Sequence, residues 1–311
     1  MIDYTTTEIP IQSISLHDKW CLHHMLRLPA NNTLSESIRT YGILRPLIVI
    51  KQRDTVFELL CGRQRYQVWK NDLHKDRIVC HVLQPPLQTI SLLRLIFEDQ
   101  RLSGLLSAVE KAQFSALCQE LLTPEELSKL FELLKLGNLG YLQRITRLLT
   151  LERPILDALH AGRLSDKVGF ELITMSAEDR FQLYTLFDKL SLNNNKQRRL
   201  ISYMRTLCSR EKSTMSDYLQ KNYGELTRAA AVENAPQVGL NLLNDLQRRC
   251  MPMSSRAEKE FQDQVSQLKL PATCSVEHSP AFEKDSVTLS ISFENLTDLS
   301  QKAPDLIKLI K

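Results

Sequence analysis

The sequence predicts an α+β N-terminal domain, an all-α middle domain and a small α+β C-terminal unit within 311 residues. Residues 34–83 alternate between helical and β-rich patterns. After that the strand signals disappear, and apolar residues recur three or four positions apart. Two β-rich runs return near the C-terminus. We therefore expect domains at 1–86, 87–210 and 253–311, with a connector at 211–252.

Local signals place each element of the first domain. LSESIRTYG has apolar residues at helical spacing and ends at Gly42, which is typical of a helix C-cap. LIVIK and TVFELL surround the turn-forming Gln-Arg-Asp and predict a β-hairpin. RQRYQVWKNDL after Gly62 predicts a short helix, and RIVCHVL predicts a further strand. The glycine therefore ends a strand and opens a helix.

Helical spacing continues through the middle domain. TPEELSKLF offers Thr123 as an N-cap, Pro124 at the first helical position and acidic residues in the first turn. The following segment, NLGYLQRITRLLTL, predicts a helix whose polar side chains face outward or lie at its flank. Its apolar side chains are expected to pack inward: Leu139, Leu142, Ile145 and Leu149.

The last part of the chain changes type again. The polar, irregular connector is expected to hold only some helix. SSRAEKEFQDQVSQLKL then predicts a helix, TCSVEHS and DSVTLSISF predict two strands, and NLTDLSQKAPDLIKLIK predicts a closing helix interrupted near Pro304. A unit this small buries little surface alone, so we expect a homodimer that pairs through it.

Composition is that of a globular protein, with 43% hydrophobic and 24% charged residues. Every apolar run is shorter than the ~20 residues that a membrane-spanning helix needs, and LRPLIVI is ended by Lys51 and Arg53. The first residues contain no basic stretch followed by an apolar one, so no secretion signal is visible. We expect a cytoplasmic protein with no membrane partner.

Cysteine and histidine spacing predicts no metal site. The seven cysteines are widely scattered without a CxxC pair, which is typical of reduced, mostly buried thiols. HDKWCLHHM does gather His17, Cys21, His23 and His24. Neighbouring residues cannot both face one ion on a regular element, however, and no second half-site follows at zinc spacing.

Charge is uneven along the chain. Residues 141–210 hold twelve Lys and Arg against seven Asp and Glu, whereas residues 87–140 hold five against seven. A basic face of this kind is typical of a protein that binds a polyanion. An ordinary solvated helical surface is the alternative.

Two stretches carry a resemblance to a known family. SESIRTYGILRPLIVIKQRDTVFELLCGRQRYQVW resembles the N-terminal domain of ParB-type partition proteins, with a Gly-ended helix, a Pro-Ile-Val strand and a Gly-x-Arg-Arg-Tyr turn. EKAQFSALCQELLTPEELSKLF and YLQRITRLLTLERPILDALHAGRLSDKVGFELI are similar to the helix-turn-helix domain of that family. The resemblance covers residues 34–207, and the order of its motifs is more specific than any one motif.

The resemblance implies a ParB/sulfiredoxin-like first domain that holds CTP with Mg²⁺. It also implies a dimer that clamps on double-stranded DNA, is associated with the nucleoid and acts in chromosome or plasmid segregation or in related DNA organisation or regulation. The C-terminal unit is compatible with the family's dimerisation domain by position. A ParA-type partner ATPase is not expected, because the first residues lack the short basic, Gly-Leu-rich tail that engages it.

The glycine turn matches the family's phosphate site. Residues 62–66 stand where the family has Gly, an acidic residue, two Arg and often Tyr. A helix start attracts anions, and an Arg side chain can hold a phosphate through two N–H bonds. The resemblance thus implies nucleotide binding by Gly62, Arg63, Arg65 and Tyr66, while Gln64 replaces an arginine. The alternative is that Arg65 only pairs with a carboxylate in the fold.

The family's second nucleotide motif, Glu-Asn-x-x-Arg, is altered here. Counting back from Arg101, its first two positions are Phe97 and Glu98. Glu98 and Arg101 remain candidate nucleotide ligands, and Glu98 or Asp99 can reach a Mg²⁺ ion, whereas a phenylalanine cannot. CTPase activity is therefore expected to be weakened or lost.

The helix that begins at about residue 138 is expected to enter the major groove of DNA. Arg and Gln can make bidentate contacts with base edges, and Tyr suits a phosphate contact. Gln143 and Arg144 either read bases or only touch phosphates and solvent. The candidate DNA-binding residues are Asn138, Tyr141, Gln143, Arg144 and Arg147.

Two other classes of function compete with DNA partition. One is a phosphoryl-transfer or nuclease-type enzyme that uses the N-terminal domain, and the other is a plain transcriptional regulator in which that domain is a scaffold. Spacing alone places no carboxylate pair or His-carboxylate set near the Arg63 turn. Sulfiredoxin's catalytic cysteine falls on Arg63 and not on Cys61, so we expect Cys61 to be a buried thiol. The sequence favours a DNA-binding protein over a metabolic enzyme.

Overall fold

The chain divides into two compact units, residues 1–188 with 192–198 and residues 189–191 with 199–311. In the part of the chain that the structure describes, no helix is both long and apolar enough to cross a membrane. The four predicted domain ranges stay predictions. The closing helix expected over 295–311 is present at residues 296–300, and most of its remainder, including the expected interruption near Pro304, lies outside the described residues. The structure is a computed structural model and describes residues 2–23, 25–26, 32–53, 55–229, 231–271, 273–279, 286–300 and 303.

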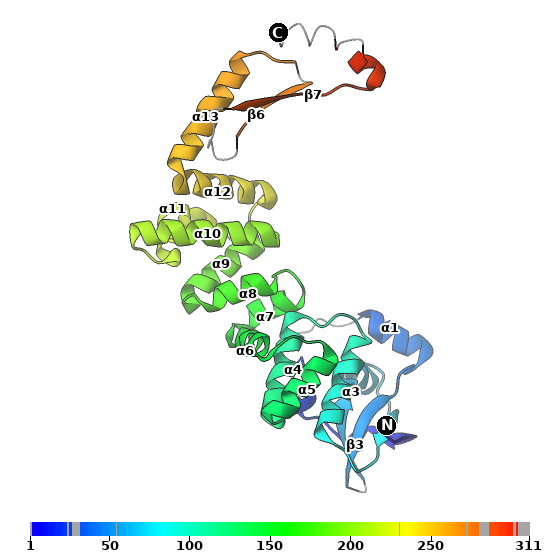
Figure 1. Cartoon of the computed structure of the whole chain (residues 1–311). Helices are drawn as coiled ribbons and strands as arrows, with labels where there is room; N and C mark the ends of the chain where they lie inside the picture. Colours follow the sequence, from blue (N-terminus) through cyan, green and yellow to red (C-terminus); the bar gives the residue numbers. More distant parts are fainter. Residues whose placement is uncertain are drawn as a thin grey trace. The chain divides into compact units, whose positions relative to one another are not determined.

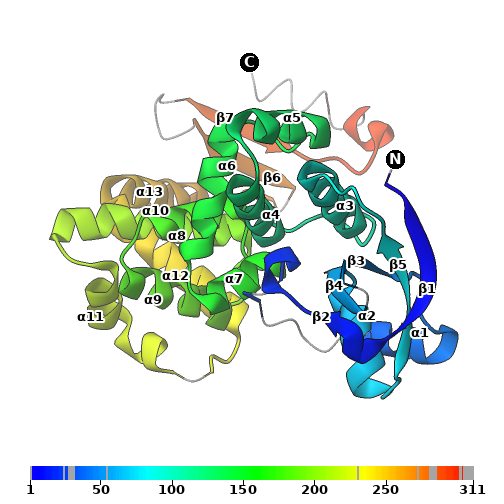
Figure 2. The ribbon, with the colours of Figure 1, turned by 90° about the horizontal axis from the view of Figure 1, so that it is seen from below.

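A five-stranded mixed sheet, which includes β3, forms the N-terminal part of the first unit (Figure 1). Its strands, labelled in Figure 2, follow the order β1-β5-β3-β4-β2. The predicted hairpin is confirmed, because β3 and β4 pair antiparallel. The outer strand β1 was not predicted, and it pairs antiparallel with β5 over its whole length. The strands span Tyr4–Pro10 (β1), Ile14–Ser15 (β2), Leu47–Arg53 (β3), Val56–Cys61 (β4) and Arg77–Leu83 (β5).

One face of this sheet packs against the short helix that the glycine turn opens. That helix is α2 (Arg63–Gln67), which continues as the π-helical turn η3 (Val68–Asp72). Tyr66 lies in the buried cluster on this face, and Trp69 packs against it. Figure 2 shows α2 and α1 (Asn32–Tyr41) on the same side of the strands. Helix α1 ends before Gly42 in the left-handed region, as predicted.

The opposite face of the sheet carries the larger core. Helices α3 (Thr89–Arg101) and α4 (Ala108–Leu121) contribute Ile96, Phe97 and Phe114 to it, and strand β4 contributes Leu60. Ser107 caps α4 through a reciprocal capping box with Glu110. The short 3-10 turns η1 (Ile11–Ser13) and η2 (Asp18–Trp20) lead the chain past the sheet before α1.

The helical region then continues as predicted, with one correction. The capping box of Thr123 and the proline at the first position of the next helix are present. Leu142 and Ile145 are buried, but the third inward residue is Leu148 and not Leu149. The α-helix ends at Thr146, and the 3-10 turn that follows advances by three residues per turn. The side chain of Leu139 lies outside the described set.

The helices of this region have short connections. Four residues join α5 to α6, with Lys135 and Gly137 in the left-handed region and Asn138 as the N-cap of α6. Helix α10 crosses the boundary between the two units. The elements are α5 (Pro124–Leu134), α6 (Leu139–Thr146), η4 (Arg147–Thr150), α7 (Arg153–His160), α8 (Asp166–Ile173), α9 (Ala177–Lys189) and α10 (Asn194–Glu211).

The second unit holds more helix than the sequence predicted. The predicted connector at 211–252 forms α11 (Met215–Arg228) and α12 (Ala235–Cys250), because each has one apolar stripe that the unit buries. Tyr218 and Leu243 lie in this core. The predicted helix and two strands that follow are confirmed as α13 (Pro252–Gln267), β6 (Cys274–His278) and β7 (Val287–Ile291).

Candidate functional site

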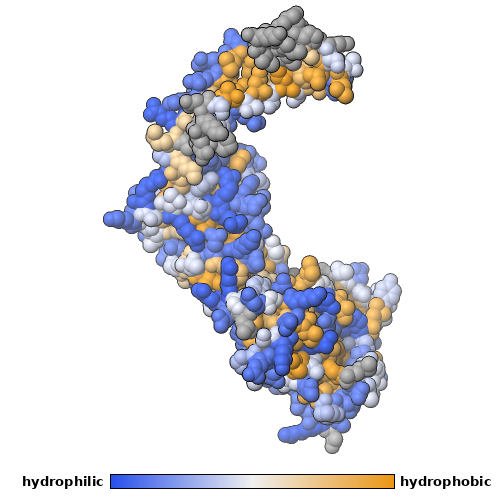
Figure 3. Space-filling view, viewed as in Figure 1, coloured by the Kyte–Doolittle hydropathy of each residue, from blue (hydrophilic) through white to orange (hydrophobic). Residues whose placement is uncertain are grey.

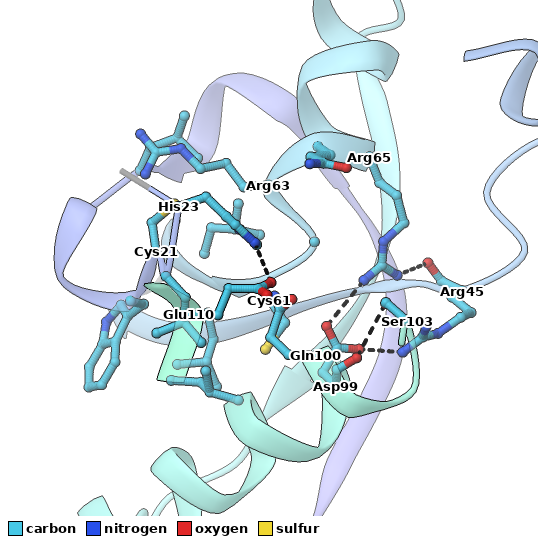
Figure 4. Close-up of a pocket in the computed structure, with 18 of the residues that line it drawn as sticks. Cys21, His23, Arg45, Cys61, Arg63, Arg65, Asp99, Gln100, Ser103 and Glu110 are labelled. Carbon is cyan, nitrogen blue, oxygen red and sulfur yellow. Dashed lines mark hydrogen bonds and ion pairs between the residues drawn. The ribbon is translucent and has the colours of Figure 1, made fainter. Parts of the chain in front are cut away.

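A cavity of 460 Å³ opens in the first unit where β4 ends and the glycine turn leads into α2. Figure 4 shows two groups of charged side chains in its wall. Arg45, Arg65 and Asp99 form one group, which we call the arginine wall. His23, Glu110 and His160 form the other, which we call the histidine wall. Side chains from six different parts of the chain therefore meet around one space.

Gly62 shapes the floor of this cavity. Its φ of +100° lies in the left-handed region, where any residue that has a Cβ is destabilised. A Cβ at this position would lie 2.6 Å from Cδ2 of the fully buried Leu47 and 3.1 Å from Nη2 of Arg65. The turn therefore needs glycine both for its backbone angle and for the close approach of its neighbours.

The arginine wall is an ion-pair network that the fold already satisfies. Arg45 Nη2 lies 2.5 Å from Oδ1 of Asp99, and Arg65 Nη2 lies 3.5 Å from Oδ2 of the same carboxylate. Arg65 Nη1 also donates to the carbonyl oxygens of Arg45 and Pro46. Burial lowers the pKa of Arg65, although the Asp99 charge opposes that shift. Pairing of Arg65 with a carboxylate, the alternative considered above, is thus present in the structure.

Arg63 lies nearer the mouth of the cavity. Its Nη1 is 2.7 Å from Oδ1 of Asp18, a carboxylate that is 69% exposed. Burial lowers the pKa of Arg63, but hydrogen bonds and charges from Asp18 and Cys21 outweigh it and raise the pKa overall. Because its partner is in solvent, Arg63 is the arginine of the turn that can most easily change partners.

The histidine wall centres on Glu110. Its Oε1 lies 2.7 Å from Nε2 of His23, and its Oε2 lies 3.8 Å from Nδ1 of His160. Burial lowers the pKa of His23, but hydrogen bonds with Cys21 and Glu110 raise it to about 9. Burial raises the pKa of Glu110, but hydrogen bonds from His23 and Ser107 bring it down to about 2. The raised pKa of His23 and the lowered pKa of Glu110 both favour the charged form of the side chain, so the two residues form a charged pair.

Cys21 and Cys61 have opposite surroundings within the same cavity. Burial raises the pKa of the Cys21 thiol, but hydrogen bonds from His23 and the charge of Arg63 outweigh it and hold the pKa below its ordinary value. Burial, with the Asp99 charge, raises the pKa of Cys61. Cys61 is buried as predicted, and none of the seven cysteines, all within the described residues, forms a disulfide.

The remaining predicted nucleotide residues lie away from this space. Tyr66 is buried in the core beneath the sheet, where its hydroxyl accepts a hydrogen bond from Lys70. Arg101 pairs with Glu98 on the surface of α3, at 2.8 Å. Phe97 is 5% exposed and belongs to the core, so it presents no ligand atom. Gly62, Arg63 and Arg65 are the predicted members that the structure brings together at the cavity.

The five predicted DNA-binding residues lie together on α6, on its N-cap residue Asn138 and on Arg147, the first residue of η4. Asn138 Oδ1 accepts from the N–H of Tyr141, whose half-buried ring lies against Gly137. Gln143, Arg144 and Arg147 are exposed. The Arg144 guanidinium carbon stands 4.1 Å from the ring centroid of Phe170 on α8. Within the described residues, neither Arg144 nor Arg147 forms an ion pair with a carboxylate.

Sequence reasoning missed three members of the cavity wall, namely Arg45, Glu110 and His160, and it named Asp99 only as a possible Mg²⁺ ligand. Arg45 precedes the predicted β3 strand, and Asp99 is the residue next to the altered nucleotide motif, so proximity to a motif was the available signal. Glu110 was visible only as part of a capping box, and His160 only as the end of a helix. Spacing alone identified no His-carboxylate set near the turn, and the structure adds one in the pair of His23 and Glu110, which are 87 positions apart.

No protein-family model matches the sequence, and no curated protein matches it. Solved ParB structures are similar to the chain. The pNOB8-like ParB N-domain has 17% identity and a TM-score of 0.37, and the match covers 80% of this chain and 98% of that chain. The C-terminally truncated chromosome-partitioning protein ParB from Caulobacter crescentus, complexed to the centromeric parS site, has 16% identity and a TM-score of 0.35, with 63% and 98% covered.

The same Caulobacter crescentus protein complexed with CTP-gamma-S has 18% identity and a TM-score of 0.26, with 56% of this chain and 94% of that chain covered. All three TM-scores lie below 0.5, so no property of these proteins is transferred to this chain on that likeness. The predicted mixed α+β region followed by many helices is present in the described residues themselves.

Proposed function

We propose that this protein is a ParB-like DNA-binding protein that acts as a homodimer in chromosome or plasmid segregation or in related DNA organisation or regulation. It would work at the nucleoid, in the cytoplasm. The carrying observation is α6, which buries Leu142 and Ile145 and leaves Gln143, Arg144 and Arg147 exposed. A helix with one buried face and an outward row of Arg and Gln is suited to the major groove.

The side chains of α6 are arranged for different contacts. The planar guanidinium of Arg144 stacks against the ring of Phe170. This contact orients the N–H donors of Arg144 and leaves its positive charge without a counter-charge from the ring. Arg147 extends from the first residue of η4, one turn further along, where a phosphate contact is the simpler role. We assign base reading to Gln143 and Arg144, and phosphate contact to Arg147 and the half-buried Tyr141.

Titration of the full chain with labelled duplex DNA, at several salt concentrations, tests this proposal. Arg147→Ala should weaken binding to all duplexes alike and reduce the salt slope by about one, whereas Arg144→Ala should also relax preference between sequences. Arg39→Ala, on the exposed face of α1, removes the same charge and should change neither. Equal losses in Arg39→Ala and Arg147→Ala would contradict a specific role for α6.

The cavity is our candidate for the nucleotide site, with CTP and Mg²⁺ as the ligand that the sequence resemblance implies. Arg63 can release the exposed Asp18 and take a phosphate, and Arg45, which is 44% exposed, can supply a second guanidinium. Efficient CTP hydrolysis is not expected, because the position where the family has a metal-supporting glutamate is Phe97, which is buried in the core.

Arg63→Ala is the more specific test of that site, because Arg65→Ala would also remove one of the two ion pairs of the buried Asp99. Fluorescent CTP should bind the wild type and lose at least about tenfold affinity in Arg63→Ala, the loss of one charge-assisted phosphate contact. Arg39→Ala serves again as the charge-matched control. DNA binding without any nucleotide binding would favour the plain regulator. Loss of DNA binding at low salt, with nucleotide bound, would favour the enzyme.

Dimer formation is proposed through the strand pair of the second unit. Val276, Val287 and Leu289 share one face of that pair with His278, which contacts Phe261 of α13. Helix α13 covers this face only in part, since Val287 is 61% and Leu289 54% exposed. Figure 3 shows apolar residues gathered over these strands. A second copy would cover them.

Sedimentation of the full chain tests the dimer. Leu289→Asp should shift the chain to monomer, because it places a charge in the apolar face. Thr288→Asp, on the opposite and polar face of the same strand, is the matched control and should leave the dimer intact. A wild-type monomer at micromolar concentration would exclude this interface.

A further inference from the structure

The histidine wall holds three metal-ligating side chains from distant parts of the chain. His23 follows η2, Glu110 lies in the first turn of α4, and His160 ends α7. One ligand atom from each side chain lies within 4.8 Å of the other two. Their side chains are only 17%, 11% and 26% exposed, so the group is not a chance meeting of surface residues.

The spacing of these atoms fits a single small ion. Bonds of about 2.0–2.1 Å to a tetrahedral zinc ion place two ligand atoms about 3.3 Å apart. The measured separations from the Glu110 carboxylate are 2.7 Å to His23 Nε2 and 3.8 Å to His160 Nδ1, one on each side of that value. All three ligand atoms lie within 4.8 Å of one another, so side-chain rotation, with loss of the proton that His23 shares with Glu110, would bring them to one ion.

A supporting layer already orients the ligands. The backbone N–H of Ser107 donates to Glu110 Oε2 at 2.7 Å, which fixes the carboxylate in the capping box. The hydroxyl of Ser107 lies 3.0 Å from Nδ1 of His160, so a metal ion bound at that nitrogen would take the place of this hydrogen bond. The two imidazole rings stand 5.5 Å apart and nearly perpendicular, which keeps their nitrogens directed at one carboxylate instead of at each other. Outer contacts of this kind are what hold metal ligands in place.

We propose that His23, Glu110 and His160 form a binding site for a divalent transition metal, with Zn²⁺ as its occupant. Two imidazoles and one carboxylate are the ligand set of catalytic zinc sites, which keep a further position open. Here all three ligands line the 460 Å³ cavity, so the open position faces the space beside Arg63. Nitrogen ligands favour zinc over Mg²⁺, and the site is therefore separate from any metal carried by a nucleotide.

The ligand set also assigns a role to the HDKWCLHHM segment. That segment alone offers no second half-site, and the structure supplies the missing ligands from α4 and α7. Cys21 lines the same cavity and forms a hydrogen bond with His23, so it helps to orient one of the proposed ligands. Binding of zinc would tie the segment before α1 to the first helices of the helical region.

The experiment uses the full chain, freed of metal by a chelator that is then removed. Co²⁺ is added as a spectroscopic probe of nitrogen and oxygen coordination, and Zn²⁺ is then used to displace it. The wild type should bind one Co²⁺ per chain with the visible absorption of a four-coordinate ion and exchange it for Zn²⁺. His160→Gln, which keeps a partner for Ser107, should weaken binding at least about 100-fold, more than loss of an outer contact would.

His278→Gln is the matched control, because His278 pairs with Glu258 at the same 2.7 Å in the second unit without a second histidine. Zn²⁺ should raise the unfolding temperature of the wild type and of His278→Gln but not of His160→Gln. Circular dichroism confirms that His160→Gln is folded, and Glu110→Gln serves if it is not. Absence of the cobalt spectrum in the wild type, or unchanged binding in both ligand variants, would overturn the proposal.

Discussion

The cavity and the α6 surface both present arginines, but the surroundings of these arginines differ. In the cavity, Arg45 and Arg65 share the carboxylate of Asp99, which is 8% exposed. On α6, Arg144 rests on an aromatic ring and Arg147 extends into solvent. A buried cation must be paired to be tolerated, whereas an exposed one is stabilised by water. Arg65, whose side chain is 16% exposed, therefore serves stability first, whereas Arg144 on α6 and Arg147 on η4 are available for a partner.

This difference is measurable, because substitution should cost folding free energy in one region and binding free energy in the other. Asp99→Ala should have the largest effect. It leaves two guanidinium groups without their shared carboxylate, and breaking a buried pair of this kind costs about 3 kcal/mol of unfolding free energy. Urea unfolding of the full chain measures it. Asp18→Ala removes the exposed partner of Arg63 and should cost under about 0.5 kcal/mol; equal losses would erase the distinction.

Gly62→Ala should come next, at about 2 kcal/mol, since it places a Cβ at positive φ and against the buried Leu47. Gly42→Ala is the matched control. Its φ is +73°, but nothing lies within 4 Å of the added carbon, so only the backbone term of about 1 kcal/mol remains. Thermal unfolding of both variants provides the comparison, and a larger loss in Gly42→Ala would refute the packing argument.

Glu152→Gln should have an intermediate effect of about 1 kcal/mol, because Glu152 and Arg180 form a half-buried pair through two oxygens. The Arg180 hydrogen bonds hold the pKa of Glu152 below its ordinary value of 4.5. The folded-state pKa is depressed, so this stabilisation is complete above 4.5 and is lost as the pH falls through the folded-state value.

The free energy of unfolding, measured from neutral to acidic pH, should therefore be larger for the wild type than for Glu152→Gln, and this difference should shrink as the pH falls. Glu260→Gln, which removes an exposed helical pair with Arg256, is the control and should show almost no difference at neutral pH. A difference that grows on acidification would have the wrong sign for this pair.

Arg147→Ala should have the smallest effect on folding, within about 0.5 kcal/mol, since the side chain is exposed and forms no ion pair with a carboxylate among the described residues. Its DNA affinity should nevertheless fall. Arg144→Ala should cost slightly more, about 0.5 to 1 kcal/mol, because the stacking on Phe170 is lost. A loss above 2 kcal/mol in Arg147→Ala would show that α6 serves the fold in the same way as the cavity does.

Elements with local signals were predicted well, and elements defined by distant partners were not. The hairpin of β3 and β4, the turn at Gly62 and the capping box of Thr123 all depend on residues a few positions apart. Strand β1 is not predicted, because its partner in the described sheet, β5, lies more than 65 residues later in the chain. Helices α11 and α12 were read as a connector because their exposed faces are polar.

By itself, the sequence determined the glycine turn, the two faces of α6 and the cysteine pattern, because each is a matter of local backbone geometry or spacing. Only the tertiary structure decided which charges meet. Arg45 and Asp99 are 54 positions apart, and His23 and Glu110 are 87 apart. No periodicity spans such separations. The packing of α3 and α4 on the sheet brings these residues together, and each buried carboxylate gains partners that compensate for its lost hydration.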